Sequence, residues 1–280
     1  MFYLFKLFIQ MKILYNKDDL NEALNNVKNL GFVPTMGSLH KGHISLIKKS
    51  KTLCNKTIVS IFVNPTQFNN RNDYLKYPKN HKKDLTILKK LKVDFVLLPK
   101  IGDIYSSKKL TKIKIAKKNQ ILCAKFRRGH FEGVIDVMRR LTTLIKPKKI
   151  FMGEKDFQQL YLVKKYLKNE YASKIISCKT IRNKNKLPLS SRNLLLSKTK
   201  LNKASKLIQN LMNIKKKFSK NINFNKMLNL KRKELSKLYN VKIEYLELRN
   251  VNNLKLSNKL KNSKIFIAFY LDKVRLIDNF

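Results

Sequence analysis

Long apolar runs and paired cysteines are both missing from the sequence. No apolar stretch approaches the ~20 residues that a membrane-spanning helix needs, so no such helix is expected. The three cysteines, Cys54, Cys123 and Cys178, are far apart and show no CxxC spacing. This pattern excludes a disulfide framework and a cysteine zinc site, and it predicts reduced thiols in a cytoplasmic protein.

Acidic residues are also scarce. Against 63 Lys and Arg stand 17 Asp and Glu, which gives a formal net charge of +46. Such a charge attracts polyanions, so one interpretation is binding to nucleic acid or to an anionic membrane. The other is drift in codon usage, because Lys, Asn and Ile are abundant while only 7 glycines and no tryptophan occur. The lysines are spread along the whole chain, so we favour drift and expect no specific nucleic-acid partner and no membrane.

The first ten residues, MFYLFKLFIQ, are apolar and precede a second methionine, Met11. A signal peptide or a membrane-surface anchor is one interpretation of them, although no small-residue cleavage site follows. We favour the other interpretation, in which residues 1–10 are a dispensable extension or the result of a misplaced start.

From about residue 30 to 180, short β-branched runs alternate with segments of helical period. The expected strands are 31–35, 57–63, 93–99, 148–152 and 174–181, and the expected helices are 41–54, 81–92, 131–146 and 156–169. This alternation predicts a doubly wound α/β, Rossmann-like domain with a parallel sheet. In such sheets ligands bind beyond the carboxyl ends of the strands, so the loops after the strands are candidate site segments.

After about residue 183 the pattern changes. Helices are expected at 197–218 and 224–239, and antiparallel strands at 241–251, 264–271 and 273–279. We therefore predict two domains: a Rossmann-like domain at 11–185 and a smaller, lid-like α+β domain at 186–280.

The segment PTMGSLHKGH at 34–43 holds two of the four histidines, His40 and His43, where a predicted strand gives way to a helix. Free backbone N–H groups at a helix N-terminus, with imidazoles beside them, form an environment that suits phosphate. Two surface histidines are one alternative. A metal site is the other, but no nearby Cys, Asp or third His completes a ligand set.

The segment SIFVNPTQF at 60–68 ends a predicted strand in two neutral amides, Asn64 and Gln67. Amides can orient a hydroxyl or a carboxylate without adding charge, which suits a small polar substrate. A simple Asn-Pro turn explains the same residues, and the segment alone leaves both interpretations open.

The segment GEKDFQQL at 153–160 places Lys155 between Glu154 and Asp156, directly after another predicted strand. A lysine suits phosphate, and the carboxylates could orient it or help to hold Mg²⁺ through water. The helix dipole alone explains an acid such as Asp156 at a helix start, but it disfavours a cation there. We therefore favour a functional role.

The segment LPLSSRN at 187–193 carries two hydroxyls and an arginine between the two predicted domains. A mobile phosphate clamp is one interpretation. The other is an ordinary loop before a helix whose N-cap is Ser197. Taken alone, the segment favours the ordinary loop.

In this order, the four segments resemble the pantoate–β-alanine ligase (pantothenate synthetase) family of the HxGH nucleotidyltransferase-like superfamily. The resemblance begins near Gly31 and includes YPKN at 77–80, RRGHFEGV at 127–134 and RLIDN at 275–279. It implies an enzyme in which pantoate attacks the α-phosphorus of ATP to give pantoyl adenylate and pyrophosphate. β-Alanine then displaces AMP to form pantothenate. The resemblance also implies Mg²⁺ bound with ATP, no direct protein ligand for the metal, and a homodimer.

The resemblance assigns roles to individual residues. The implied catalytic residues are His43, His40 and Lys155. His43 matches the family's proton donor, although stabilising developing phosphate charge is the role that its chemistry supports. Gln67 and Gln159 match contacts to pantoate, Gln67 would also neighbour β-alanine, and Asn64 lies close by. The implied ATP contacts are Met36, Gly37, Ser38, Leu39, His40, Lys41, Gly42, His43, Gly153, Glu154, Lys155, Asp156, Ile181, Leu189, Ser190, Ser191 and Arg192.

Four positions depart from the usual pattern of the family, namely Lys41, Thr66, Arg128 and Glu132. None of them removes a proposed ligand, so we expect activity. Two rival functions remain. One is a nucleotidyltransferase that uses another acid or a phosphate ester, and the other is a nucleic-acid-binding protein, motivated by the charge.

Overall fold

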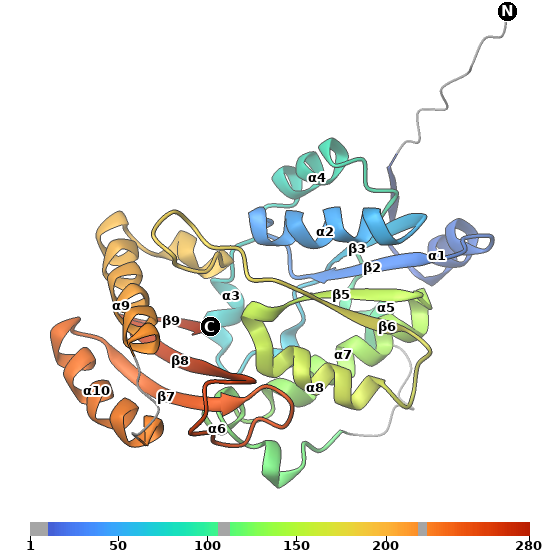
Figure 1. The fold of residues 1–280 in the computed structure, drawn as a ribbon. Helices are drawn as coiled ribbons and strands as arrows, with labels where there is room; N and C mark the ends of the chain where they lie inside the picture. Colours follow the sequence, from blue (N-terminus) through green and yellow to red (C-terminus); the bar gives the residue numbers. More distant parts are fainter. Residues whose placement is uncertain (1–10, 106–112, 218–222) are drawn as a thin grey trace, which may run out of the picture.

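The computed structural model describes residues 11–105, 113–217 and 223–280. Figure 1 shows two units, a larger one built on a parallel sheet and a smaller one built on an antiparallel sheet. The predicted extension at residues 1–10 lies outside the described residues. Within the described ranges, no helix combines the length and the apolar character needed to cross a bilayer.

The larger unit contains a six-stranded, fully parallel sheet in the order β1-β4-β3-β2-β5-β6. Its strands are β1 (Lys12–Leu14), β2 (Leu30–Thr35), β3 (Lys56–Ile61), β4 (Phe95–Leu97), β5 (Lys149–Gly153) and β6 (Lys174–Cys178). From β2 the chain winds outward through β3 and β4, and it later returns to the other side of β2 through β5. The strand order therefore reverses between β2 and β5, where a doubly wound sheet opens a crevice.

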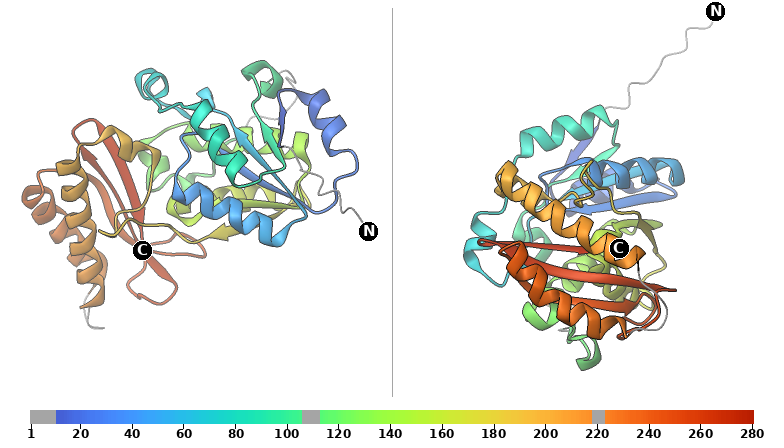
Figure 2. Two further views of the ribbon diagram at one scale, coloured as in Figure 1. Left: turned by 90° about the horizontal axis from the view of Figure 1, so that it is seen from above. Right: turned by 60° about the vertical axis from the view of Figure 1, so that its left-hand side comes forward.

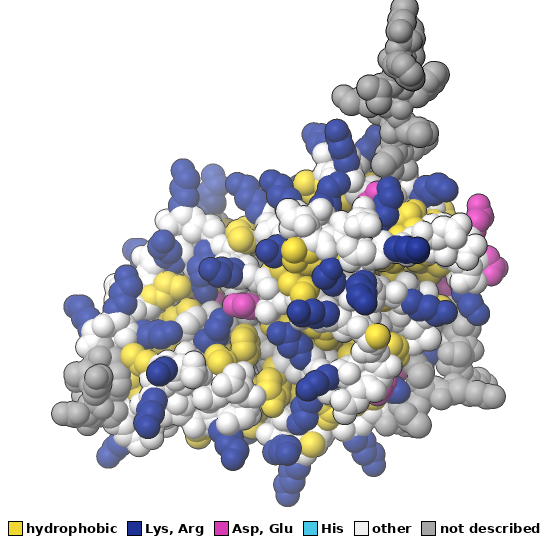
Figure 3. Space-filling view, turned by 45° about the vertical axis from the view of Figure 1, so that its right-hand side comes forward, with side chains coloured by type: hydrophobic (Ala, Val, Ile, Leu, Met, Phe, Trp, Pro, Cys, Tyr) yellow, Lys and Arg dark blue, Asp and Glu magenta, His cyan; other side chains and the backbone are white. Residues whose placement is uncertain are grey.

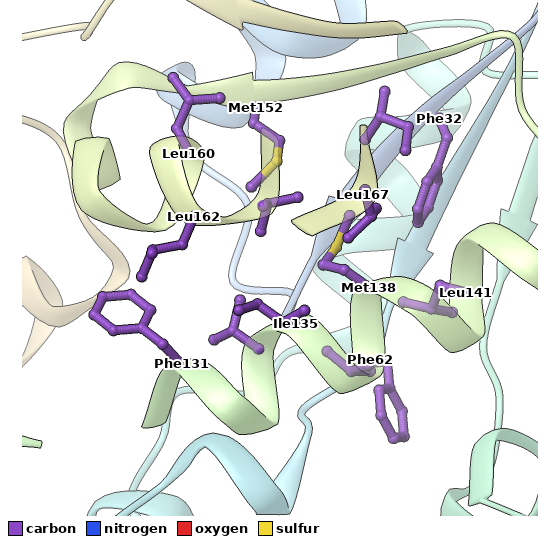
Figure 4. Close-up of a cluster of buried hydrophobic side chains, with 14 of the residues drawn as sticks. Phe32, Phe62, Phe131, Ile135, Met138, Leu141, Met152, Leu160, Leu162 and Leu167 are labelled. Carbon is purple, nitrogen blue, oxygen red and sulfur yellow. The ribbon is translucent and has the colours of Figure 1, made fainter. Parts of the chain in front are cut away.

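Helices cover both faces of this sheet. The helices of the larger unit are α1 (Lys17–Leu24), α2 (Lys41–Leu53), α3 (Arg71–Leu75), α4 (His81–Lys90), α5 (Ile101–Tyr105), α6 (Cys123–Phe126), α7 (His130–Ile145) and α8 (Phe157–Leu167). Side chains alternate along β2, so Phe32 packs in the cluster under α7 and α8, while Val33 packs in the cluster under α2 and α4. Figure 4 shows the first of these clusters, where Phe32 lies near Met138 and Leu141 of α7.

Short 3₁₀ turns lie between these elements. They are η1 (Pro65–Gln67), η2 (Lys117–Asn119), η3 (Glu154–Asp156) and η4 (Ser191–Leu195). Three of the four, η1, η3 and η4, contain residues of the predicted site segments.

The smaller unit has a three-stranded antiparallel sheet in the order β7-β8-β9, with α9 and α10 on one face. Its elements are α9 (Lys198–Lys216), α10 (Phe224–Leu238), β7 (Lys242–Asn250), β8 (Ser263–Leu271) and β9 (Val274–Asn279). The other face of this sheet turns to the larger unit, since the ring of Phe266 lies 5.7 Å from that of Phe157. Figure 2 shows the two units side by side.

The predicted architecture, a parallel-sheet unit followed by a smaller α+β unit, is confirmed. The predicted strand at 93–99 is shorter in the structure, where only Phe95–Leu97 is extended, and the strand at 174–181 ends at Cys178. The helix expected at 156–169 begins at Phe157, after η3. Sequence reasoning did not predict β1, α1, α3, α5 and α6, which are too short or too weakly patterned to show a clear period.

Candidate active site

A cavity of about 240 Å³ opens at the carboxyl ends of the parallel strands. It lies at the reversal of strand order, between the loops that follow β2, β3, β5 and β6. Four of the stretches of chain that line it contain the four motifs of the sequence. The lining residues from the predicted site are Met36, His40, Gly42, His43, Asn64, Gln67, Gly153, Lys155, Asp156, Gln159, Ile181, Leu189, Ser190, Ser191 and Arg192.

The loop after β2 is held in place by a buried carboxylate. Gly37 and Ser38 both adopt a left-handed backbone, with φ of 77° and 52°. The backbone N–H groups of Ser38 and Leu39 each donate to a carboxylate oxygen of Asp84 in α4, at 2.8 Å. The Asp84 side chain is 1% exposed, so these charge-assisted bonds fix the loop firmly. Gly37, Ser38 and Leu39 therefore shape the site without lining the cavity.

His40 and His43 cap the start of α2, and each ring uses its Nδ1 atom for the cap. Nδ1 of His40 accepts from the N–H of Gly42 at 3.0 Å, and Nδ1 of His43 accepts from the N–H of His40 at 3.3 Å. Their ring centroids are 4.1 Å apart. Because each Nδ1 accepts, each Nε2 carries the hydrogen and is free to donate to a ligand.

Both rings are uncharged in this structure at neutral pH. Burial, together with the charge of Lys155, lowers the pKa of His40 to about 4. Burial and the neighbouring His40 lower the pKa of His43 to about 3. The site therefore offers two neutral imidazole donors rather than two imidazolium ions. An incoming polyphosphate, being anionic, acts in the opposite direction and favours protonation.

Gly42 allows this ring arrangement. A Cβ at position 42 would lie 2.7 Å from Cε1 of His40, the ring that caps its own backbone N–H. The structure thus gives a steric reason for the glycine between the two histidines. Lys41, between His40 and Gly42 in the sequence, is exposed and does not line the cavity.

Lys155 reaches the cavity from η3, directly after β5. Its Nζ lies 3.6 Å from a carboxylate oxygen of Asp156, which also lines the cavity. Glu154 turns the other way and contacts Lys264 of β8, with 3.3 Å between Oε2 and Nζ. Of the two predicted acids, only Asp156 therefore faces the site.

The loop 189–192 closes the opposite side of the cavity. The hydroxyl of Ser191 donates to the carbonyl of Ser38 at 3.2 Å, which joins this loop to the histidine loop. Arg192 Nη2 lies 3.0 Å from a carboxylate oxygen of Asp73 in α3. The guanidinium is held by one partly exposed carboxylate, and it keeps donors that can face a ligand.

The three predicted amides differ in their surroundings. Asn64 is 1% exposed, and its side chain is used by the protein: Oδ1 accepts from Tyr105 at 2.7 Å and Nδ2 donates to the carbonyl of Gly133 at 3.2 Å. The Gln67 amide contacts Met36 beside the cavity. Gln159 lines the cavity from α8, whereas its neighbour Gln158 turns inward and donates to the carbonyl of Ile121 at 2.7 Å.

Among the lining residues that were not predicted as site residues are Tyr77, Arg127 and His130. His130 donates from Nδ1 to the carbonyl of Gln67 at 2.7 Å and accepts from Arg127 Nη1 at 2.8 Å. Burial lowers the pKa of His130 to about 3 and that of Arg127 to about 10. Two segments of the sequence resemblance, YPKN and RRGHFEGV, contain these residues and could have pointed to them.

A protein-bound metal centre finds no support in the described ranges. There, no group of three or more His, Cys, Asp or Glu side chains is arranged to hold a metal ion. The three cysteines are free thiols. Asp156 supplies a carboxylate at the cavity wall, a type of ligand that hard divalent ions prefer.

Comparisons with known proteins identify the family of the chain. The family model for pantoate-beta-alanine ligase matches residues 12–280. A pantothenate synthetase of Francisella tularensis subsp. mediasiatica is 43% identical over 264 residues, which cover 93% of this chain and 92% of the relative.

Solved structures show the same fold. The crystal structure of pantoate-beta-alanine ligase from Francisella tularensis, complexed with beta-gamma ATP and beta-alanine, has a TM-score of 0.82 at 40% identity and covers 97% of both chains. The pantothenate synthetase of Thermus thermophilus has a TM-score of 0.82 at 27% identity, covering 97% of this chain and 99% of that chain. Both matches run through the larger and the smaller unit. The chain belongs to the pantoate–β-alanine ligase family.

Proposed function

We propose that this chain is a ligase that condenses pantoate with β-alanine to give pantothenate, in a reaction that converts ATP to AMP and pyrophosphate. One observation carries the proposal. His43, Lys155 and Arg192, from three remote stretches of chain, converge on one cavity that Gln67 and Gln159 also line. The related Francisella protein was crystallised with beta-gamma ATP and beta-alanine, which supports the same ligands here.

In the first half-reaction, a carboxylate oxygen of pantoate attacks the α-phosphorus of ATP. The bond to the β-phosphate oxygen breaks, and pyrophosphate leaves with the electron pair. Negative charge spreads over the phosphoryl oxygens, where the Nε2–H groups of His40 and His43 can donate. Lys155 and Arg192 add positive charge at the same site. Catalysis then depends on positioning and charge stabilisation, without a nucleophile from the protein.

In the second half-reaction, the amine of β-alanine attacks the acyl carbon of pantoyl adenylate. The bond to the phosphate oxygen breaks, AMP leaves, and the new amide nitrogen loses a proton. We assign the orientation of pantoate to the amides of Gln67 and Gln159. The Asn64 amide is used by the protein, so we assign it the placement of Gln67, whose amide oxygen lies 3.5 Å from its Nδ2.

The remaining predicted ATP contacts divide into three groups. We propose that Met36, Gly42, Gly153, Asp156, Ile181, Leu189, Ser190 and Ser191 contact the nucleotide, since all line the cavity. Gly37, Ser38, Leu39 and Glu154 would shape the loops that carry these contacts. Lys41 is exposed, so we propose that it acts at most on the outer rim.

We propose that Mg²⁺ enters with ATP, without a direct protein ligand, and that Asp156 would face it through water. The ion would neutralise phosphate charge when it is bound.

We further propose a Rossmann-like domain at 11–185, a lid-like domain at 186–280, a homodimer and a cytoplasmic location. Reduced cysteines support the location. Sedimentation velocity would test the dimer.

A coupled assay of AMP release tests the function, with ATP, Mg²⁺, pantoate and β-alanine each omitted in turn. We expect AMP only when all four are present, and pyrophosphate release when β-alanine alone is missing. A panel of other hydroxy acids tests the rival nucleotidyltransferase. Release of pyrophosphate with another acid but not with pantoate would contradict the substrate assignment.

A further inference from the structure

We infer that Asn279, in the last strand of the smaller unit, is a positioning residue for Lys155; this inference rests on the proposed function. Asn279 belongs to the segment RLIDN, to which the site described above assigns no role. Its side chain is 2% exposed, and its Nδ2 donates to the carbonyl oxygens of Glu154 and Lys155, each at 2.8 Å. One amide therefore holds two consecutive residues of the turn that carries the lysine.

The turn has little local support of its own. η3 is three residues long, and neither Gly153 before it nor Asp156 at the start of α8 makes a side-chain cap bond. Lys155 also carries a long side chain with many rotamers, so a fixed backbone matters for where its ammonium lies. The amide of Asn279 supplies this fixation from outside the larger unit.

The orientation of the Asn279 amide is itself determined. Its Oδ1 accepts from Nζ of Lys264 at 3.1 Å, so the oxygen faces the ammonium and the nitrogen faces the two carbonyls. Lys264 also lies 3.3 Å from the carboxylate of Glu154. The result is a closed set of contacts in which β8, β9 and η3 hold one another.

A buried ion pair beside Asn279 ties in the segment of Ile181 as well. Asp278 is 3% exposed and accepts two bonds from Arg182, at 2.7 and 2.8 Å. Arg182 also donates to the carbonyl of Asn279 at 3.1 Å, and it directly follows the cavity residue Ile181. The end of β9 therefore fixes two site segments relative to each other.

Loss of these bonds should affect the chemical step more than substrate binding. A displacement of a catalytic group by about 1 Å can lower the rate about 10²-fold, because the interactions that matter are those made in the transition state. We therefore expect Asn279→Ala to lower kcat for pyrophosphate release about 10- to 100-fold, with the KM for pantoate changed by less than about threefold.

A matched control lies in the same unit. Asn225 of α10 also donates from Nδ2 to two backbone carbonyls, those of Leu248 and Ser257, at 3.2 and 2.8 Å, but it lies away from the cavity. Asn225→Ala loses the same kind of bonds and should lose comparable stability. We expect its kcat to stay within about threefold of wild type, at a temperature where thermal unfolding shows that each variant is folded.

A double-mutant cycle separates positioning from a general structural role. If Asn279 acts through Lys155, then adding Asn279→Ala to Lys155→Ala should lower the residual rate less than about twofold, far from additivity. Asn279→Asp, which keeps the shape but removes both donors, should behave like Asn279→Ala. It also replaces the alanine variant in the cycle should that variant fail to fold.

The outcomes are distinct. Active Asn279→Ala and Asn279→Asp variants with wild-type kcat, or full additivity with Lys155→Ala, would overturn the positioning role alone. A wild-type protein that releases no pyrophosphate with pantoate would overturn the proposed function, and this inference with it.

Discussion

At the residue scale, His40 and His43 differ from ordinary surface histidines in their charge and in the position of their ring hydrogen. Their Nδ1 atoms accept from the backbone, and the pKa values of His40 and His43 fall to about 4 and about 3. Lys155 already provides a cation nearby, so further positive charges on the rings would repel it until an anion binds. Neutral donors avoid this repulsion and still bind phosphate oxygen.

We expect His43→Ala to lower kcat for adenylate formation about 10²- to 10³-fold, because one donor to the developing phosphate charge is lost. His81→Ala is the control, since His81 is exposed at the start of α4 and does not line the cavity. Pyrophosphate release measures both. A fully active His43→Ala variant would show that the ring makes no contact in the transition state.

Two buried histidines, His43 and His130, predict how the stability of the fold depends on pH. The pKa values of His43 and His130 are about 3, against an ordinary value of 6.5. Below pH 6.5 these two histidines therefore bind protons in the unfolded chain but stay neutral in the folded protein. The free energy of unfolding consequently falls as the pH falls. Each ring contributes up to ~1.4 kcal/mol per pH unit between about pH 6.5 and its folded pKa.

Chemical denaturation at pH 7.5, 6.5 and 5.5 measures this slope, in a range above the ordinary pKa of carboxyl groups. His130→Asn should be less sensitive to pH than wild type, because it removes one of the buried rings. Equal free energies of unfolding at pH 6.5 and 5.5 would contradict the prediction.

At the element scale, the sequence predicted those strands and helices whose hydrophobic period is clear within their own segment. The main strands and helices of the parallel sheet have strong periods. Three of the four motifs directly follow a strand, so their place at the carboxyl edge followed from the fold class. His43 and Lys155 could be brought together by this rule, whereas Arg192 was added by the family resemblance alone.

Contacts between remote segments could not be predicted in this way. Asp84 binds the histidine loop across 45 residues or more, and Asn279 binds η3 across more than 120. A single sequence shows that such side chains exist but not which backbone groups they reach. The side-chain direction of Glu154, away from the site, was hidden for the same reason.

The start of α2 gives a prediction at this scale. We expect Gly42→Ala to lower activity while the fold persists, because the new methyl group would displace the His40 ring from its cap position. Gly102→Ala, in α5, is the control, since nothing lies within 4 Å of a Cβ there. Adenylation rates and circular dichroism spectra of the two variants test this. Equal activity would show that the ring can move without loss.

At the scale of the whole molecule, the positive residues are spread along the whole chain. Figure 3 shows Lys and Arg side chains scattered over the face in view, with few acidic ones among them. This distribution fits the interpretation that the net charge of +46 reflects composition rather than one docking face. It also means that the folded chain repels itself.

We therefore expect salt to stabilise the protein. Raising the ionic strength from about 0.01 to about 0.1 M shortens the Debye length from about 30 to about 10 Å, which screens repulsion between distant lysines. The melting temperature, measured by calorimetry in NaCl, should rise across this range. A melting temperature that falls would show that attractive ion pairs outweigh the repulsion.

The carboxylate of Asp84, buried beneath the loop after β2, has a consequence for how tightly a nucleotide can bind. Because contacts within the protein already order that loop, its loss of conformational entropy belongs to folding and is not incurred again when a ligand arrives. Such preorganisation leaves more of the contact energy available as affinity. It also makes nucleotide recognition depend on a side chain that the nucleotide never touches.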